Sequence, residues 1–312
     1  MRLAFILPIA LLLVALVTAP AEAGVRVALS EQSARMFDDP SWQSLKLKRV
    51  RYVVPWDYAK HTDQANEVGT FMNAARVSRQ DVLVTFTARR GCFVNNRYSR
   101  SGACRAPSAS AYRSAVRAFR RSYPFAKTFA PWNEANHVSQ PTFRKPSLAV
   151  RYYNALRGAC KGCKVMAADV LDSSDVASYL RGFLRASHGR GRIWGLHNYK
   201  DVNRRQSRGL TTVLRTVPGE VWLTETGGIV KFGSDFPRSE SRAAAGTKYM
   251  FQLASRYDAR RRGLRARLSR LYVYRFYGEP SGSRFDAGLV NENGSLRPSY
   301  RQFKKYARRL PK

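Results

Sequence analysis

The chain has 312 residues, of which 44% are hydrophobic and 24% charged, so it is long and apolar enough to bury a sizeable core. Its 21 glycines and 14 prolines show no period, which excludes collagen-like and low-complexity proteins. The 55 lysines and arginines against 21 aspartates and glutamates give a formal net charge of +34. Such an excess suggests nucleic acids, acidic glycans or an anionic surface as partners, and it does not bear on the fold.

Residues 1–23 have the pattern of a secretory signal peptide. A short basic start precedes an apolar run at residues 3–17, and Ala21-Glu22-Ala23 has the small-x-small form of a cleavage site. A membrane anchor is the alternative, but the run is shorter than the ~20 residues that a spanning helix needs. We therefore expect a secreted protein, cleaved near Ala23. No later stretch is apolar enough to span a bilayer, so residues 24–312 are expected to be soluble.

Four cysteines stand at positions 92, 104, 160 and 163. In an exported chain an even number of cysteines indicates disulfides, and pairing nearest neighbours gives Cys92–Cys104 and Cys160–Cys163. A four-thiolate zinc site is the alternative, but it needs two short Cys-x-x-Cys hooks, and only CKGC provides one. A thioredoxin-type role would place CKGC at the start of a helix, whereas it follows a helical stretch. We expect two structural disulfides and no metal site.

Short β-rich runs alternate along the chain with stretches of helical period. The runs lie at residues 25–30, 49–56, 81–89, 128–134, 164–171, 193–199, 220–226 and 270–277. The clearest helical patterns lie at residues 66–78, 109–123, 147–159, 175–187, 241–262 and 297–310. Strands that alternate with helices imply parallel pairing and right-handed crossovers. Eight such units predict an α/β fold, a single closed (β/α)8 TIM barrel.

An open, doubly wound sheet is the main alternative to the barrel. Such a sheet is expected to carry a ligand-binding fingerprint at its first turn, and neither G-x-G-x-x-G nor G-x-x-x-x-G-K-[ST] is present. No linker rich in proline, glycine or serine divides the chain, and its composition does not shift. The sequence therefore favours one domain over residues 24–312.

Two carboxylates stand out at the ends of the predicted strands, where a barrel keeps its reactive residues. Glu134 lies in APWNEAN at the end of the fourth run, and Glu225 lies in WLTETGG at the end of the seventh. Both strand ends are otherwise apolar, and an unpaired charge is costly there. Two carboxyls about 5 Å apart suit glycosidic cleavage with retention, one protonated through a raised pKa and the other ionised.

These motifs resemble those of the clan A retaining glycoside hydrolases, a clan that includes cellulase, β-1,3-glucanase and β-xylosidase-like barrels. The shared pattern is Asn-Glu after an aromatic on strand four and Thr-Glu on strand seven. The resemblance spans essentially all of residues 24–312 and assigns the acid/base to Glu134 and the nucleophile to Glu225. The clan also often places His and Tyr beside the nucleophile, as His197 and Tyr199 stand in GLHNY.

Polar and aromatic side chains near the two glutamates are the predicted substrate contacts, because sugars need hydrogen bonds and apolar ring faces. Many clan members end strand eight in a tryptophan; here the run ends in YVYRFY, so Phe276 or Tyr277 is expected to replace it. The full set of predicted contacts is Asn133, Trp132, His197, Tyr199, Trp56, Phe276 and Tyr277. Barrel packing is an alternative role for Trp132, and a structural role is an alternative for His197.

The sequence predicts a secreted, monomeric glycosidase without cofactor or metal that cleaves a β-linked polysaccharide or oligosaccharide. No H-E-x-x-H or G-x-S-x-G motif points to a metallohydrolase or a serine hydrolase. The alternative function is a barrel of the same shape that only binds carbohydrate or cell wall. The basic surface is either a solvated face or a means of adhesion to anionic wall polymers. Nucleic acid is not expected, because no recognised nucleic-acid-binding motif accompanies the charge.

Overall fold

The computed structural model describes residues 24–259 and 261–311 of the chain. The predicted signal peptide at residues 1–23 therefore lies outside the described residues. Within the described part, no helix combines the length and apolar character that crossing a membrane requires.

One parallel sheet of nine strands forms the centre of the described part of the chain, in the order β7-β6-β3-β2-β1-β12-β10-β9-β8. Its strands are β1 (Arg26–Ser30), β2 (Arg49–Pro55), β3 (Asp81–Thr87), β6 (Thr128–Ala130), β7 (Lys164–Val165), β8 (Asp169–Leu171), β9 (Ile193–His197), β10 (Gly219–Thr226) and β12 (Ala266–Tyr274). Every strand pair in this sheet is parallel, as the βα alternation predicted.

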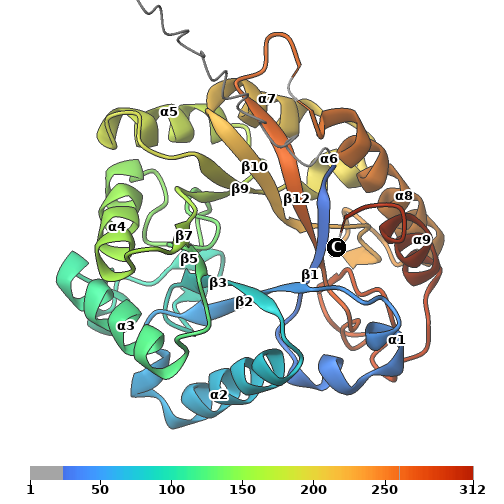
Figure 1. The fold of residues 1–312 in the computed structure, drawn as a ribbon, viewed down its shortest axis with the longest axis horizontal. Helices are drawn as coiled ribbons and strands as arrows, with labels where there is room; N and C mark the ends of the chain where they lie inside the picture. Colours follow the sequence, from blue (N-terminus) through green and yellow to red (C-terminus); the bar gives the residue numbers. More distant parts are fainter. Residues whose placement is uncertain (1–23, 260, 312) are drawn as a thin grey trace, which may run out of the picture.

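The sheet closes into a barrel through its fifth strand. The two strands at the ends of the order, β7 and β8, are halves of the single run predicted at residues 164–171. β7 pairs with β6, and β8 pairs with β9. Between them, the Met166 amide donates to the Phe129 carbonyl and the Ala167 amide to the Ile193 carbonyl, each at 2.8 Å. The predicted (β/α)8 barrel is confirmed, and Figure 1 shows the closed ring of strands inside its ring of helices.

Helices follow the strands and pack around the outside of the barrel (Figure 1). The α-helices are α1 (Pro40–Gln43), α2 (Thr62–Val77), α3 (Ala109–Ser122), α4 (Pro146–Ala159), α5 (Val176–Ala186), α6 (Tyr199–Asn203), α7 (Arg208–Thr216), α8 (Glu240–Tyr257) and α9 (Pro298–Ala307). Short 3-10 segments lie at Ala34–Asp38, Tyr58–Lys60 and Gly102–Cys104. All six helical patterns in the sequence correspond to observed helices.

In the described part of the chain, two small antiparallel sheets of two strands each lie outside the barrel sheet. β4 (Phe93–Val94) pairs with β5 (Arg97–Tyr98), and β11 (Lys231–Phe232) pairs with β13 (Phe285–Asp286). Both predicted disulfides are present. Cys92–Cys104 closes the loop that holds β4 and β5, and Cys160–Cys163 follows α4, each with 5.5 Å between its Cα atoms.

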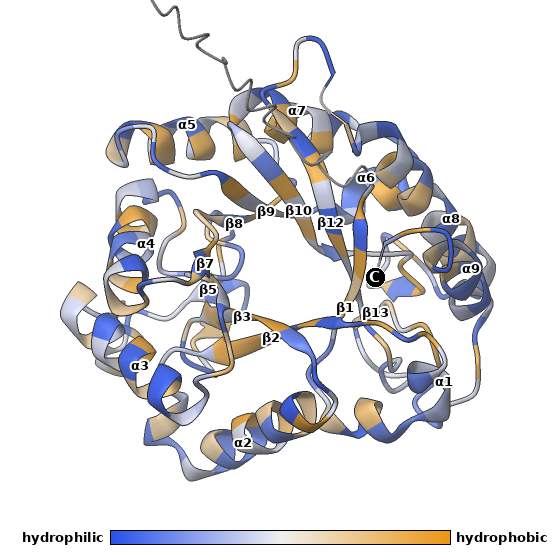
Figure 2. Cartoon of the chain, viewed as in Figure 1, coloured by the Kyte–Doolittle hydropathy of each residue, from blue (hydrophilic) through white to orange (hydrophobic). Residues whose placement is uncertain are grey.

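Side chains alternate along the strands between two apolar clusters, because successive strand residues point to opposite faces. The larger cluster joins strand residues such as Val27 and Val82 to the helices. The smaller cluster fills the inside of the barrel with the intervening residues Ala28, Leu83, Ala130, Met166, Trp222 and Tyr272. Figure 2 shows the hydrophobic residues concentrated on the strands and on the inner faces of the helices.

Polar residues occupy the interior above and below this inner apolar cluster. Toward the C-terminal ends of the strands, the interior positions hold Ser30, Arg51, Thr85, Asp169, His197 and Thr224, all 0% exposed. Where the strands begin, they hold Arg26, Arg49, Asp81, Lys164, Glu220 and Arg270. We call this second set the lower mouth of the barrel. The fold thus separates two groups of charged side chains by a layer of apolar ones.

The largest differences in strand limits concern the fourth and eighth predicted strands, while the third and sixth each end two residues earlier than predicted. The fourth ends at Ala130 and not at residue 134, because Pro131 has no amide hydrogen to continue the ladder. The eighth spans Ala266–Tyr274 and not residues 270–277. Its first residues were missed because Arg267, Ser269 and Arg270 interrupt the apolar pattern.

Candidate active site

Glu134 and Glu225 meet at the C-terminal end of the barrel. One carboxylate oxygen of each lies within 4.8 Å of the other and of a ring nitrogen of His197. The side chains are 22% and 13% exposed, so both can be reached from outside. Carboxyls separated by ≈ 5–5.5 Å are typical of retaining glycosidases, whereas inverting enzymes need ≈ 6.5–9.5 Å to admit a water. The spacing therefore matches the retaining geometry.

Local backbone features aim both glutamates into the barrel. Glu134 has φ +43°, in the left-handed region, and its neighbours are held by hydrogen bonds on either side. The Asn133 amide donates to the Phe86 carbonyl at 2.7 Å, and the Ala135 amide donates to the Asp169 carbonyl at 2.8 Å. On β10, a register irregularity between Leu223 and Glu225 redirects the strand end, as bulges next to active sites do.

Arg51 lies at the centre of the site and is completely buried. From β2 it reaches across the barrel, where Nη1 donates to Glu225 Oε1 at 2.6 Å. Nη2 donates to Asn133 Oδ1 at 2.6 Å and to Asp169 Oδ2 at 3.0 Å. Because guanidinium groups only donate, the Asn133 amide must turn its oxygen to Arg51, which leaves its NH2 group for a ligand.

His197 connects three carboxylates from inside the barrel wall. Its Nδ1 lies 3.1 Å from Glu134 Oε1 and 3.6 Å from Glu225 Oε2, and its Nε2 lies 3.3 Å from Asp169 Oδ1. Burial alone would lower its pKa, but Glu225 and Asp169 outweigh burial and raise the pKa to about 10. The imidazole is therefore protonated at neutral pH and donates to carboxylates on both sides.

Asp169 is the buried anion that balances the two cations. It is 0% exposed and accepts hydrogen bonds from Arg51 and from the Thr224 hydroxyl. Burial alone would raise its pKa, but the charges of His197 and Arg51 lower it to about 2. Asp169 does not line the cavity, so its role is to hold the two cations in place.

The pKa of Glu134 differs from the sequence expectation that one glutamate is held protonated. Burial alone would raise this pKa, but the hydrogen bond and charge of His197 outweigh burial and lower it. The site therefore keeps its proton on His197, 3.1 Å from Glu134 Oε1.

Tyr199 contacts the opposite side of Glu225, where its hydroxyl donates to Oε2 at 3.3 Å. Burial raises the pKa of Tyr199 well above its usual value, so the phenol keeps its proton. Among the described residues, Glu134, His197 and Glu225 form the group whose donor atoms could converge on one metal ion. A protonated imidazole has no lone pair for a metal, so the arrangement favours hydrogen bonding over ligation.

A cavity of about 470 Å³ opens above the two glutamates. Tyr274, at the end of β12, forms part of its wall, together with Phe232 and Phe285 of the small β11–β13 sheet. The Phe285 ring lies edge-on to both Tyr199 and Phe232, with centroids 5.5 Å and 5.7 Å apart. These aromatic faces, together with the polar groups at the base, suit a sugar ring.

Several predicted substrate contacts lie elsewhere. Trp132 is 1% exposed, stacks on Tyr152 and donates to Gln140, so it packs the barrel wall. Phe276 is 0% exposed and Tyr277 bonds to Asp39, so neither lines the cavity; Tyr274 takes the expected place. Phe276 and Tyr277 lie away from the cavity because the chain turns away from its mouth after Tyr274, and Trp132 lies away from it because its ring packs on Tyr152.

Trp56 also lies outside the cavity wall. It is half-buried against the main core, and the Lys60 ammonium lies 5.3 Å from its ring centroid. The predicted residues that the structure does bring together are Glu134, Glu225, Asn133, His197 and Tyr199.

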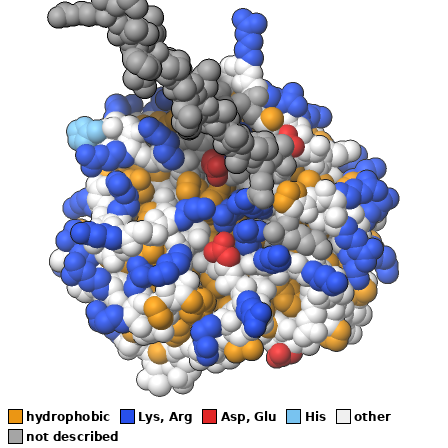
Figure 3. Space-filling view, viewed as in Figure 1, with side chains coloured by type: hydrophobic (Ala, Val, Ile, Leu, Met, Phe, Trp, Pro, Cys, Tyr) orange, Lys and Arg blue, Asp and Glu red, His pale blue; other side chains and the backbone are white. Residues whose placement is uncertain are grey.

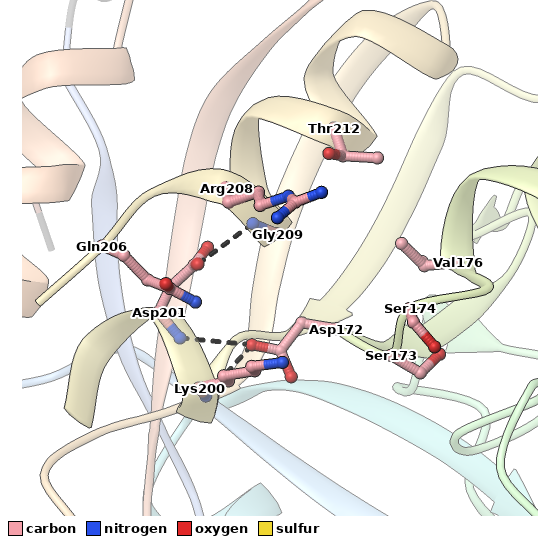
Figure 4. A pocket seen from close by; sticks show the side chains of 10 residues that line it. All are labelled: Asp172, Ser173, Ser174, Val176, Lys200, Asp201, Gln206, Arg208, Gly209 and Thr212. Carbon is pink, nitrogen blue, oxygen red and sulfur yellow. Dashed lines mark hydrogen bonds between the residues drawn. The ribbon is translucent and has the colours of Figure 1, made fainter. Parts of the chain in front are cut away.

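A second pocket of about 310 Å³ adjoins the first and shares Asp172 and Lys200 with it. Figure 4 shows Asp172 accepting from the backbone amides of Lys200 and Asp201, at 3.0 Å and 3.3 Å, while Arg208 reaches over the pocket from α7. Burial, followed by the charge of Asp201, raises the pKa of Asp172 to about 7. The pocket extends the cleft away from the glutamates.

The sequence interpretation missed Arg51, Asp169 and the aromatic wall. Arg51 carried a usable signal, because a lone arginine at an interior position of an apolar strand needs a partner. Asp169 lies within the predicted run 164–171 and carries no separate signal in the sequence. Phe232 and Phe285 come from loops whose pairing into β11–β13 has no local signature.

Comparisons with known proteins were made for sequence and for structure. No protein-family model and no curated protein matches the chain. Among solved structures, a GH5_18 enzyme from Streptomyces cattleya in complex with Manβ1-4GlcNAc has a TM-score of 0.65 at 12% identity, over 92% of this chain and 83% of that one. A GH10 endoxylanase from a sugarcane soil metagenome has a TM-score of 0.57 at 10% identity, over 90% and 97%.

A family 39 glycoside hydrolase from Bacteroides cellulosilyticus is also similar, with a TM-score of 0.56 at 14% identity over 91% of this chain and 64% of that one. At these identities the similarity concerns the fold. The chain therefore has the barrel fold of the family 5, 10 and 39 glycoside hydrolases, which are clan A enzymes as the sequence motifs suggested.

Proposed function

We propose that the protein is a secreted retaining β-glycosidase in which Glu225 is the nucleophile and Glu134 the acid/base. The observation that carries the proposal is the approach of the two carboxylates within 4.8 Å at the C-terminal end of the barrel. The cavity above the two glutamates, its aromatic wall and the barrel fold support the proposal. The disulfides favour an oxidising compartment and so support secretion.

In the first step Glu225 attacks the anomeric carbon and the bond to the leaving oxygen breaks. Arg51 holds Oε1 of Glu225 and Tyr199 holds Oε2, so the carboxylate is aimed at the sugar. When Glu225 forms the glycosyl ester it loses its negative charge. The proton on His197 is then stabilised less by Glu225 and is released more easily. We propose that the proton donated to the leaving oxygen comes from the hydrogen bond between His197 and Glu134, and that Glu134 delivers it.

In the second step Glu134 takes a proton from water, which attacks the anomeric carbon and releases Glu225. The two displacements restore the original configuration. The Asn133 NH2 group, set free by the contact of its oxygen with Arg51, is available to a sugar hydroxyl. Phe232, Phe285 and Tyr274 present ring faces to the sugar C–H groups.

The substrate we propose is a β-linked polysaccharide or oligosaccharide. The solved structures with the same fold include complexes with Manβ1-4GlcNAc and with xylohexaose. The adjoining pocket lengthens the cleft beyond one sugar, and this supports a substrate of several residues. We also propose that the protein is a monomer.

The test is a panel of β-linked polysaccharides and aryl β-glycosides, with the anomer of the first product identified by NMR. We expect turnover with retained configuration, and no turnover by Glu225→Gln. Inverted product, or activity in Glu225→Gln equal to that of the unaltered chain, contradicts the proposal. Binding without turnover across the panel would support the alternative, a carbohydrate-binding barrel.

A further inference from the structure

The lower mouth of the barrel holds more basic side chains than acidic ones. Four of its six residues are cations, Arg26, Arg49, Lys164 and Arg270, and only Asp81 and Glu220 are anions. In the view of Figure 3, basic side chains gather around acidic ones near the middle of the face. This end of the barrel lies opposite the glutamates.

The two carboxylates of the lower mouth are already shared. Glu220 accepts from Ser269 at 2.8 Å and from the Trp222 ring nitrogen at 3.2 Å, and it pairs with Arg267 at 3.1 Å. Asp81 lies 3.5 Å from Arg49 Nε and 3.6 Å from Arg270 Nη1. These two distances exceed those of strong charge-assisted hydrogen bonds, so one carboxylate only partly balances two guanidinium groups.

Strand register forces the cations together. Arg26 and Arg270 are direct partners across β1 and β12, and like charges in that position repel. Arg270 is 4% exposed and lies over the Trp222 ring, 4.1 Å from its centroid. Burial and then the charge of Arg270 lower the pKa of both Arg49 and Lys164. The cluster is therefore charged, partly desolvated and internally repulsive.

Arg49 has guanidinium hydrogens that lack an acceptor. Its side chain is 17% exposed, yet its Nε and Nη1 atoms are buried and have no hydrogen-bond partner among the described residues, since Asp81 approaches Nε only as an ion pair at 3.5 Å. Buried guanidinium hydrogens without acceptors are costly, and they are satisfied best by an anion with several oxygens. The planar fork of arginine matches phosphate and sulfate in particular.

We propose that the lower mouth is a binding site for a phosphate-type oxyanion, with Arg49, Arg270 and Lys164 as its ligands. The anion is either free phosphate or a phosphate group on a polymer. Its oxygens would accept from Arg49 and offset the repulsion among the cations. The site is separated from the glutamates by the inner apolar cluster and does not rest on the proposed function.

The test measures binding of inorganic phosphate to the purified protein by calorimetry, at constant ionic strength set with sodium chloride. We expect saturable binding of one phosphate per chain and a higher Tm in phosphate. Arg49→Gln and Lys164→Gln should each weaken binding at least tenfold. The matched controls are Arg117→Gln on α3 and Lys248→Gln on α8, which remove equal charge from exposed helix positions and should keep phosphate binding.

Thermal unfolding without phosphate separates a lost ligand from a damaged fold. Arg49→Gln should keep or raise Tm there, because it relieves repulsion, and should lose the increase that phosphate gives. Lys164 is exposed, so its variant folds without repacking and repeats the test. Equal loss of phosphate binding in Arg49→Gln and Arg117→Gln, or no saturable binding by the unaltered protein, would overturn the proposal.

A linear polyphosphate identifies the source of the anion. If a polymer group is the ligand, polyphosphate should bind at least tenfold more tightly than inorganic phosphate, and Arg49→Gln should remove most of that gain. If free phosphate is the ligand, the affinity per terminal phosphate should be equal for both. Polyphosphate binding that is unaffected by Arg49→Gln would be a general effect of the charge of +34 and would count against the site.

Discussion

Arg51 and Glu225 stand on β2 and β10, strands that β1 and β12 separate in the barrel, and a hydrogen bond of 2.6 Å joins Nη1 of the one to Oε1 of the other. The arginine is fully buried, whereas the glutamate side chain is 13% exposed. The pair therefore connects the barrel interior with the cavity. The orientation of the proposed nucleophile thus depends on a residue that no substrate can reach.

Replacing Arg51 should therefore damage both turnover and folding. Arg51→Met leaves Asp169 buried without one of its two cations, and loss of one partner of a buried pair costs about 3–5 kcal/mol. Misplacement of Glu225 should lower kcat about 100-fold with a smaller change in KM. Steady-state kinetics and denaturant unfolding measure the two effects. An unchanged kcat in folded Arg51→Met would show that Arg51 does not position Glu225.

The two glutamates should fail in different ways when replaced. Glu225→Ala should abolish turnover of every substrate, and azide should restore it with product of inverted configuration. Glu134→Ala should spare the first step with activated aryl glycosides, giving a burst and then slow hydrolysis. Azide rescue of Glu134→Ala should give product of retained configuration. The anomeric configuration of the glycosyl azide products, determined by NMR, tests the two roles. The same configuration from both variants would mean that the roles are misassigned.

His197 should set the basic limb of the pH profile. Its pKa is raised from 6.5 to about 10, so its stabilising contribution is complete below pH 6.5 and is lost as pH rises toward 10. In His197→Gln, the Glu134 carboxyl alone must hold the catalytic proton, and activity should decline at lower pH. Profiles of kcat/KM and of Tm against pH for both proteins give the measurement.

Two outcomes would count against this role of His197. One is a basic limb that does not move in His197→Gln. The other is a stability difference between the two proteins that stays constant from pH 6.5 to 10, because linkage requires it to shrink over that range. A matched control is His188→Gln, since His188 is an exposed residue that precedes the start of β9, whereas His197 stands at the end of that strand.

The aromatic wall should act on binding more than on chemistry. Phe285→Ala removes one ring face from the cavity, and KM for oligosaccharides should rise about tenfold with little change in kcat. Trp132→Phe is the contrasting variant, because Trp132 packs the barrel wall and should alter Tm without altering KM. Initial-rate measurements on both variants test this; a raised KM in Trp132→Phe alone would restore the original sequence interpretation.

Periodicity was sufficient to predict the barrel, because eight buried strands and their helices each carry a local pattern of apolar residues. Glu134 and Glu225 could be found for a related reason: a charge at the end of an apolar strand is conspicuous. Phe232 and Phe285 could not be found this way, since they are distant in sequence and meet only through the pairing of two loops. The low pKa of Glu134 was equally hidden, because it depends on the distance to His197.

Position 134 also bears on how such a sequence evolves. A glutamate at φ +43° pays a conformational cost that glycine would avoid, so selection for stability alone would replace it. The function proposed for Glu134, and not its contribution to stability, accounts for a glutamate at this position. A copy of the chain released from its function would gain stability by losing this carboxylate, and the barrel would remain while its chemistry disappeared.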